Sequence, residues 1–403
     1  MKEAAPLSIL ASAMQRDLRD NVLPFWMRQV RDERHGGFLG RIADDLTVDP
    51  NGPKGGVLNA RILWTFAAAF RRYGDLAYRE TADRALSYLL TRFWDEIHGG
   101  TYWMLDHEGR PLAYRKQTYS IAFALYALAE YHRATGSGEA LDRAIRLYRA
   151  LEEHAADHVY GGYWEARARD WTPLEDVRLS EKDRNSPKSM NTHLHVMEGY
   201  TNLLRVWDGE GLRDRLRGLL QIHLERIVDP ASSHLLLFFD EEWRPADHAV
   251  SYGHDIEASW LIVEAAGVLG DPGLEAKAAT VAERVARVTL AEGFDRAHGG
   301  VFAEQEDGGP LDDEKHWWMQ AEAIVGFVNA WELTGDDAFL AAAEETWRFV
   351  DRFVVDRTHG EWRWRVARDG RPIAGLPKVE PWKCPYHNSR AALEAAERAE
   401  RAG

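Results

Sequence analysis

The sequence has almost no cysteine, no long uncharged apolar run and no excess of positive charge. The single cysteine, Cys384, excludes an intramolecular disulfide and any metal site built from several cysteines. Acidic residues number 65 against 50 lysines and arginines, giving a formal net charge of -15, which disfavours nucleic acid or an anionic membrane surface as a partner. No segment reaches the roughly 18 uncharged apolar residues that a membrane span requires.

These absences lead us to expect a soluble, cytoplasmic protein. We further expect a monomer or a weak homodimer. The N-terminal stretch breaks its apolar residues with charges and lacks the apolar core of a secretory signal. With 403 residues, 45% of them hydrophobic, the chain can bury a large core. Its 16 Trp, 14 Tyr and 14 Phe suit that core, and such rings also serve as stacking platforms for sugars.

One loop signature recurs six times along the chain. It has an aspartate, a turn that usually contains glycine and a short aromatic stretch, as in DERHGGF at 32–38 and DRAHGGVF at 295–302. The marker histidine, or the tyrosine that replaces it, stands at 35, 98, 160, 234, 298 and 359, at intervals of 63, 62, 74, 64 and 61 residues. This turn chemistry predicts short hairpins, and we expect the histidines to brace the turns.

Long apolar segments alternate with amphipathic ones between these loops. The apolar segments are 59–74, 119–136, 191–207, 254–270, 318–335 and 388–399, and four of them run into a glycine, a common helix stop. The amphipathic segments include 75–93, 140–158 and 337–354, with the first at about 6–32.

This alternation predicts twelve helices in six hairpins. We expect an all-α (α/α)6 barrel, a six-hairpin toroid with the apolar helices inside, the amphipathic helices outside and short β-hairpin loops at one end. No linker divides the chain, so residues 1–403 are expected to form one catalytic domain. An open superhelix is the structural alternative.

Polar and aromatic residues gather at the starts of the apolar segments, which a closed ring would bring to one pocket with their positive dipole ends. They are Asn59, Arg61, Tyr119, Asn191, His193, His195, His254, Asp255, Glu257, Trp317, Trp318, Glu322, His387, Asn388 and Arg390.

Three histidines from different repeats, His195, His254 and His387, point to acid–base chemistry. An imidazole accepts and returns a proton near neutral pH, so two of them on opposite walls can invert a carbon beside a sugar carbonyl. Arg61 and Asn191 would then stabilise the enediolate.

Other residues near the helix starts have simpler explanations. His193 lies only two residues from His195 and faces another direction, so the two cannot share a metal, and we expect neither metal nor cofactor. Asp255 suits the dipole of its helix, and Glu257 lies on the face of His254, where it is expected to orient that imidazole.

Five motifs carry a family resemblance that spans nearly the whole chain. They are LNARILWTFAAAFRR, MNTHLHVMEGYTNLLRVW, SYGHDIEASWLIVEA, KHWWMQAEAIVGF and WKCPYHNSRAALE. In this order they resemble the N-acylglucosamine 2-epimerase superfamily, most closely its cellobiose 2-epimerase branch. The resemblance implies an (α/α)6 barrel that interconverts reducing-end glucose and mannose units of β-1,4-linked disaccharides, such as cellobiose or lactose, without metal or nucleotide.

The resemblance also implies roles for single residues. His254 and His387 match the acid/base pair, and His195 matches a third active-site histidine that helps to open the sugar ring. The residues matching positions that hold the reducing-end sugar are Arg61, Tyr119, Asn191, Glu257, Trp318 and Trp382, with Trp317 beside them. Ser180 and Asp183 resemble positions that reach the second sugar. Gln117 and Ile121 depart from the family pattern near Tyr119.

Three other functions remain open at this stage. An N-acylglucosamine 2-epimerase or a monosaccharide aldose–ketose isomerase would use the same histidines on a smaller substrate. An inverting glycoside hydrolase would need two carboxylates about 6.5–9.5 Å apart, for which Glu257 and Glu322 are candidates. A non-catalytic carbohydrate-binding or helical interaction protein would leave the three histidines without a purpose.

Overall fold

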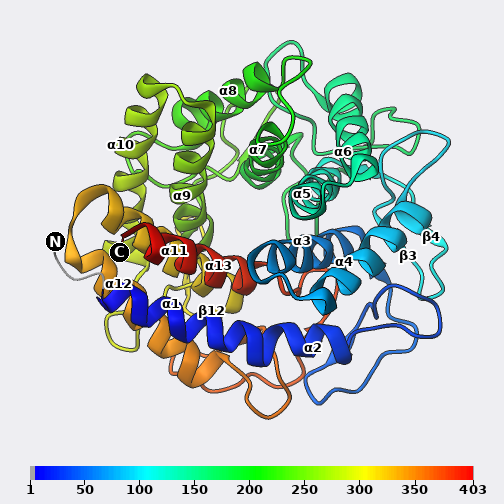
Figure 1. Ribbon diagram of the computed structural model, residues 1–403. Coiled ribbons are helices and arrows are strands. Elements are labelled where there is room, and N and C mark those ends of the chain that lie inside the picture. The colour runs from blue at the N-terminus through cyan, green and yellow to red at the C-terminus, as the bar shows by residue number, and fades with distance from the viewer. Residues whose placement is uncertain (1–4, 403) are drawn as a thin grey trace.

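Six helices, buried along most of their length, form an inner ring in the computed structural model, which describes residues 5–402 (Figure 1). They are α3 (Gly56–Tyr73), α5 (Thr118–Thr135), α7 (Met190–Leu204), α9 (Tyr252–Leu269), α11 (Trp317–Thr334) and α13 (Tyr386–Ala402). Each contacts the next, and α13 contacts α3, so the ring is closed. The apolar composition of helices such as α9 and α11 suits helices that are covered all round, whereas α13 carries several charged residues in its second half.

Amphipathic helices surround this ring. They are α1 (Ala5–Asp17) with α2 (Leu23–Arg28), α4 (Leu76–Tyr88), α6 (Gly138–Ala150), α8 (Leu212–Ile222), α10 (Pro272–Val288) and α12 (Asp337–Phe349). A π-helical turn follows α1 and each of the other outer helices except α2: η1 (Leu18–Val22), η2 (Leu89–Phe93), η3 (Leu151–Ala155), η4 (His223–Ile227), η5 (Thr289–Gly293) and η6 (Val350–Val354). The predicted (α/α)6 barrel is confirmed, while residues 1–4 and 403 of the expected domain lie outside the described range.

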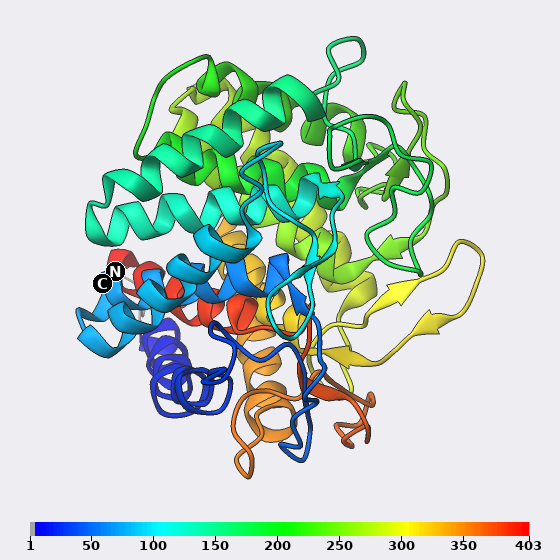
Figure 2. The same ribbon diagram turned by 90° about the vertical axis from the view of Figure 1, so that its right-hand side faces the viewer.

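Short antiparallel strands gather at one end of the barrel, opposite the end where both chain termini lie (Figure 2). The pairs are β2 (Lys54–Gly55) with β3 (Met104–Leu105), β5 (Lys116–Gln117) with β6 (Ala166–Arg167), β7 (Lys188–Ser189) with β8 (Phe238–Phe239), β9 (Val250–Ser251) with β10 (Glu304–Gln305), β12 (Lys315–His316) with β13 (Arg365–Val366), and β14 (Pro377–Val379) with β1 (Ile42–Ala43). Two further strands, β4 (Pro111–Ala113) and β11 (Leu311–Asp312), extend the first and fourth pairs.

The six pairs join different repeats, whereas β3 with β4 and β10 with β11 form hairpins of the kind expected within a loop. Each signature loop is itself closed by a single bridge, such as that between Trp94 and Thr101. The glycines of the signature are explained by their backbone: Gly99 and Gly100 have φ of 72° and 69°, in the left-handed region that other residues avoid.

Buried aspartate–lysine pairs brace five of the six loops. They are Asp32 with Lys54, Asp95 with Lys116, Asp157 with Lys188, Asp295 with Lys315, and Asp356 with Lys378, at N–O distances from 2.5 to 3.4 Å. The loop histidines contribute less than expected. Nδ1 of His298 lies 3.3 Å from Oδ2 of Asp295 and Nδ1 of His359 lies 3.5 Å from Oδ2 of Asp356, whereas His98 is exposed.

The fourth loop is different, because Val250 stands where the other repeats have a lysine. Here His234 does brace the loop, and its Nδ1 lies 2.7 Å from Oδ2 of Asp255 at the start of α9. Among residues 5–402, no helix combines the length and apolar character needed to cross a membrane.

Candidate active site

A cavity of about 750 Å³ opens at the strand end of the barrel. Its lining includes four of the predicted residues: Ser180, Asp183, Asn191 and His254. A volume of this size accommodates a ligand as large as a disaccharide.

His254 lies in the first turn of α9 and is partly open to this cavity. Its Nδ1 is 2.8 Å from Oγ of Ser251, and its ring packs 4.7 Å from the indole of Trp318. Burial, followed by the nearby His195, lowers its pKa to about 3, so the imidazole is neutral near pH 7.

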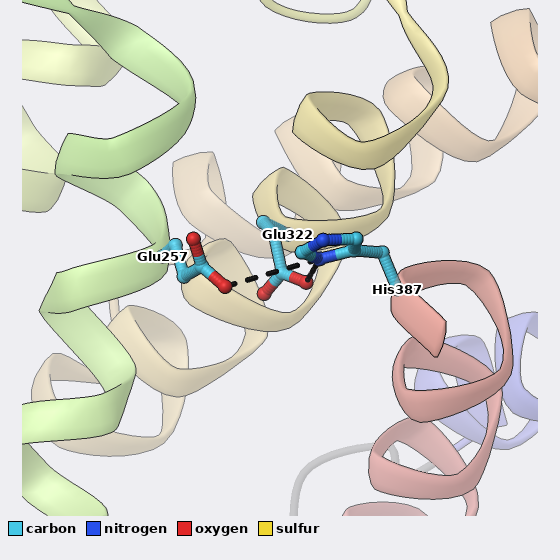
Figure 3. A group of neighbouring side chains, drawn as sticks. All are labelled: Glu257, Glu322 and His387. Carbon is cyan, nitrogen blue, oxygen red and sulfur yellow. Dashed lines mark hydrogen bonds and ion pairs between the residues drawn. The ribbon is translucent and has the colours of Figure 1, made fainter. Parts of the chain in front are cut away.

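His387 lies in the first turn of α13 and contacts the same indole, with ring centroids 5.6 Å apart. Its Nδ1 is 2.7 Å from Oε1 of Glu322 and 3.8 Å from Oε1 of Glu257 (Figure 3). Burial, followed by the guanidinium groups of Arg61 and Arg390, holds the pKa of His387 well below its usual value. The structure thus brings two neutral imidazoles from α9 and α13 against one indole.

His195 is the third histidine of the group. Its Nδ1 is 2.8 Å from Oε2 of Glu198, one helical turn later on α7. Its ring packs 4.7 Å from Phe123 and 5.0 Å from Tyr119. Burial lowers its pKa, although Glu198 favours the charged form.

Arg390 joins the carboxylates that hold these histidines. Its Nη2 donates to Oε1 of Glu257 and to Oε1 of Glu322, both at 2.7 Å, and its Nη1 donates to Glu198. Tyr386 also donates its hydroxyl to Glu198. Although burial opposes ionisation, Arg390 and His195 keep the pKa of Glu198 at about 2.

The donor set of Glu257, Glu322 and His387 is one that could hold a cation, since one atom of each lies within 4.8 Å of the others. Nη2 of Arg390 lies within hydrogen-bonding distance of both carboxylates. A guanidinium therefore already supplies positive charge at this position.

Arg61 and Tyr119 form another wall of the site. Nη2 of Arg61 donates to the Tyr119 hydroxyl at 2.8 Å, and its guanidinium lies 4.2 Å from the ring of Phe123. Trp382 packs 5.8 Å from Tyr119. Oδ1 of Asn191, at the start of α7, is buried without a hydrogen-bond partner, which leaves it available to a ligand.

The remaining predicted residues lie at the edges of this arrangement. Ser180 donates its hydroxyl to Oδ2 of Asp183 at 3.0 Å on the cavity wall. Trp317 is buried and packs 6.2 Å from His387. Gln117 is buried and donates to the carbonyl of Val177, so it supports the loop that carries Ser180.

One predicted contact is wrong. Glu257 does not orient His254, because the carboxylate of Glu257 lies beside Arg390 and His387 of α13. Ser251 takes that role instead. Sequence reasoning did not assign Ser251, Glu198 or Tyr386 to the site, although Glu198 follows His195 by three residues, a spacing that places two residues on one helix face.

The N-acylglucosamine 2-epimerase family profile matches residues 36–391. The chain belongs to this family. A cellobiose 2-epimerase from Bacteroides fragilis is 46% identical over 96% of this chain and 98% of its own length. The structure of cellobiose 2-epimerase from Bacillus thermoamylovorans superposes with a TM-score of 0.92 at 39% identity, covering 97% of this chain and all of that one. The human N-acylglucosamine 2-epimerase is 24% identical over 92% of this chain and 86% of its own.

Proposed function

We propose that this protein interconverts the reducing-end glucose and mannose units of β-1,4-linked disaccharides such as cellobiose and lactose. Its family and its relatives make it a carbohydrate epimerase, and therefore an isomerase. The observation that carries the proposal is the pair of imidazoles, His254 and His387, that contact the single indole of Trp318.

In the proposed reaction His195 assists opening of the sugar ring. One of the two paired histidines then removes the C2 proton, and the other delivers a proton to the opposite face. Arg61, held by Tyr119, offers positive charge to the enediolate oxygens, and Asn191 offers a neutral polar group.

The wall of the cavity is the part of the site that would select a disaccharide. Ser180 and Asp183 line the same cavity as His254, and a second sugar would extend along this wall. The greater identity to cellobiose 2-epimerases than to the human N-acylglucosamine 2-epimerase supports a disaccharide over an N-acylated monosaccharide.

The geometry argues against an inverting glycoside hydrolase built on Glu257 and Glu322. Both carboxylates bind one nitrogen of Arg390 at 2.7 Å, so they are closer together than the roughly 6.5–9.5 Å that admits a water and a sugar.

The test is to incubate the protein with cellobiose, lactose, mannose and N-acetylglucosamine separately in deuterated water and to identify products by NMR. We expect C2 epimers of the disaccharides carrying deuterium at C2, with no released glucose. The variants His254→Ala and His387→Ala should lose about 10²- to 10⁴-fold in epimerisation while still binding sugar. Turnover of a monosaccharide alone would overturn the substrate assignment, and unchanged turnover in either variant would overturn the mechanism.

A further inference from the structure

Three carboxylates meet one guanidinium at the centre of the site. Arg390 contacts Glu198, Glu257 and Glu322, and all four side chains are at least 98% buried. Glu198 has two further partners, His195 and Tyr386. Arg61, which donates to Tyr119, adds a second buried positive charge that acts on Glu257 without contacting it. Two guanidinium groups cannot balance three buried carboxylates, so the arrangement favours retention of a proton.

Glu257 and Glu322 are the groups placed to retain it. Their Oε1 atoms accept from the same nitrogen of Arg390, which holds two like charges close together. Oε2 of Glu257 is buried without a partner, whereas Oε2 of Glu322 accepts from Nε1 of Trp260 at 3.0 Å. Burial, followed by Glu322, raises the pKa of Glu257 to about 8, and burial also raises that of Glu322.

We propose that Glu257 and Glu322 share one proton at neutral pH, and that Glu322 passes it to Nδ1 of His387 as Nε2 of that ring protonates the sugar carbon. This inference rests on the proposed function and concerns the same site. Glu322 is the member of the pair that reaches His387, at 2.7 Å against 3.8 Å for Glu257. Glu322 is thus a positioning residue that acts through the imidazole.

The step is balanced in atoms and charge. The O–H bond of Glu322 breaks as the Nδ1–H bond of His387 forms, while its Nε2–H bond breaks and the C2–H bond forms. His387 is neutral before and after the transfer, which suits a ring surrounded by Arg61 and Arg390. The reverse reaction returns the proton to the carboxylate pair, and between turnovers in one direction His254 releases its proton to water while the pair regains one from water.

His254 is arranged in the complementary way. Its Nδ1 faces the hydroxyl of Ser251, which can accept the Nδ1 hydrogen and leave Nε2 unprotonated. In this relay the two imidazoles have opposite tautomers, one as base and one as acid.

Infrared spectroscopy of the sugar-free protein tests the shared proton directly. We expect a carbonyl band of a protonated carboxylic acid at neutral pH that disappears as the pH rises through about 8. Either Glu257→Gln or Glu322→Gln should abolish it, because the carboxylate that remains is then paired with Arg390 and ionises. Glu165→Gln is the matched control: burial raises the pKa of Glu165 to about 7, so this variant removes a separate band. A band unaffected by both pair variants would overturn the proposal.

Exchange of the C2 hydrogen with deuterated water tests the relay. In Glu322→Gln, one epimer should still exchange through His254, while epimerisation falls about 10²- to 10⁴-fold. In Glu257→Gln the alkaline limb of kcat/KM should move to lower pH, because the charge that opposed ionisation of Glu322 is gone. Equal loss of exchange from both epimers, or an unmoved limb, would contradict the relay. The infrared measurement uses the sugar-free protein. It therefore tests the shared proton even if the protein does not turn over the proposed substrates.

Discussion

Nδ1 of His254 lies 2.8 Å from the hydroxyl oxygen of Ser251, whereas Nδ1 of His195 and of His387 lies against a carboxylate. A hydroxyl holds the ring in place without stabilising the imidazolium as a carboxylate does. The two bases of the epimerisation therefore differ in electrostatic support.

Removing this hydroxyl should weaken His254 as a base. For Ser251→Ala we expect kcat to fall about 10-fold with little change in KM, since one buried hydrogen bond is lost. Ser251→Thr keeps a hydroxyl and is the matched control. Steady-state epimerisation of cellobiose measures both, and an unchanged kcat in the alanine variant would contradict the role of Ser251.

Removing the central guanidinium should destabilise the whole barrel. Arg390→Met leaves Glu198, Glu257 and Glu322 without their shared partner, and we expect the free energy of unfolding to fall by about 3–5 kcal/mol. Arg244→Met, which removes an exposed pair with Asp240, should cost at most about 1 kcal/mol. Urea denaturation compares the two, and equal losses would argue against the buried network.

The loop braces can be tested on the pair of Lys188 and Asp157, whose Nζ and Oδ2 atoms lie 2.6 Å apart. Lys188→Met should cost about 3–5 kcal/mol in unfolding free energy, because it leaves a buried carboxylate alone. Adding Asp157→Asn should restore part of that loss, so the double variant is less destabilised than the sum of the single ones. Strict additivity would show that the two side chains do not act as a pair.

The raised pKa of Glu257 also has a signature in stability. The folded protein keeps this proton up to about pH 8, whereas an unfolded glutamate releases it near pH 4.5. Its contribution to stability is therefore full below pH 4.5 and is lost as the pH rises through about 8. The unfolding free energy of Glu257→Gln should decline less across this window, and parallel curves for the two proteins would contradict the assignment.

The helical framework could be predicted from sequence because its signals are local. The apolar segment 254–270 corresponds to α9, Tyr252–Leu269, and its predicted stop is Gly270 in the left-handed conformation at φ 67°. The six-fold loop signature predicted the closed barrel, because six equivalent helical hairpins close most naturally on one another.

Contacts across the ring could not be predicted in the same way. The spacing of His254 and Glu257 places them on one helix face, but it says nothing of α13, which lies beyond α11 in the ring and brings Arg390 to Glu257. Glu361 shows the same limit. It stands where four loops have a second glycine and the fourth loop has His234. Its φ is 63°, and it accepts hydrogen bonds from Lys383 and Asn388 of a distant segment.

The lysines that pair with the loop aspartates also have a regular spacing in the sequence. A lysine precedes the apolar helix in five of six repeats, always after the aspartate of the loop, and its absence at Val250 marks the one repeat that carries His254. The regularity is visible in the sequence, but only the structure shows that these lysines turn back onto the aspartates.

The pairing of β14 with β1 joins the last repeat to the first. It is equivalent to the five strand pairs that join consecutive repeats elsewhere in the ring. Because α1 and α13 also contact each other at the far end of the barrel, a short linker could join the two ends there and new ends could be cut in another connection. Such a circular permutant should keep the same barrel, because every repeat meets its neighbours through the same contacts wherever the chain starts.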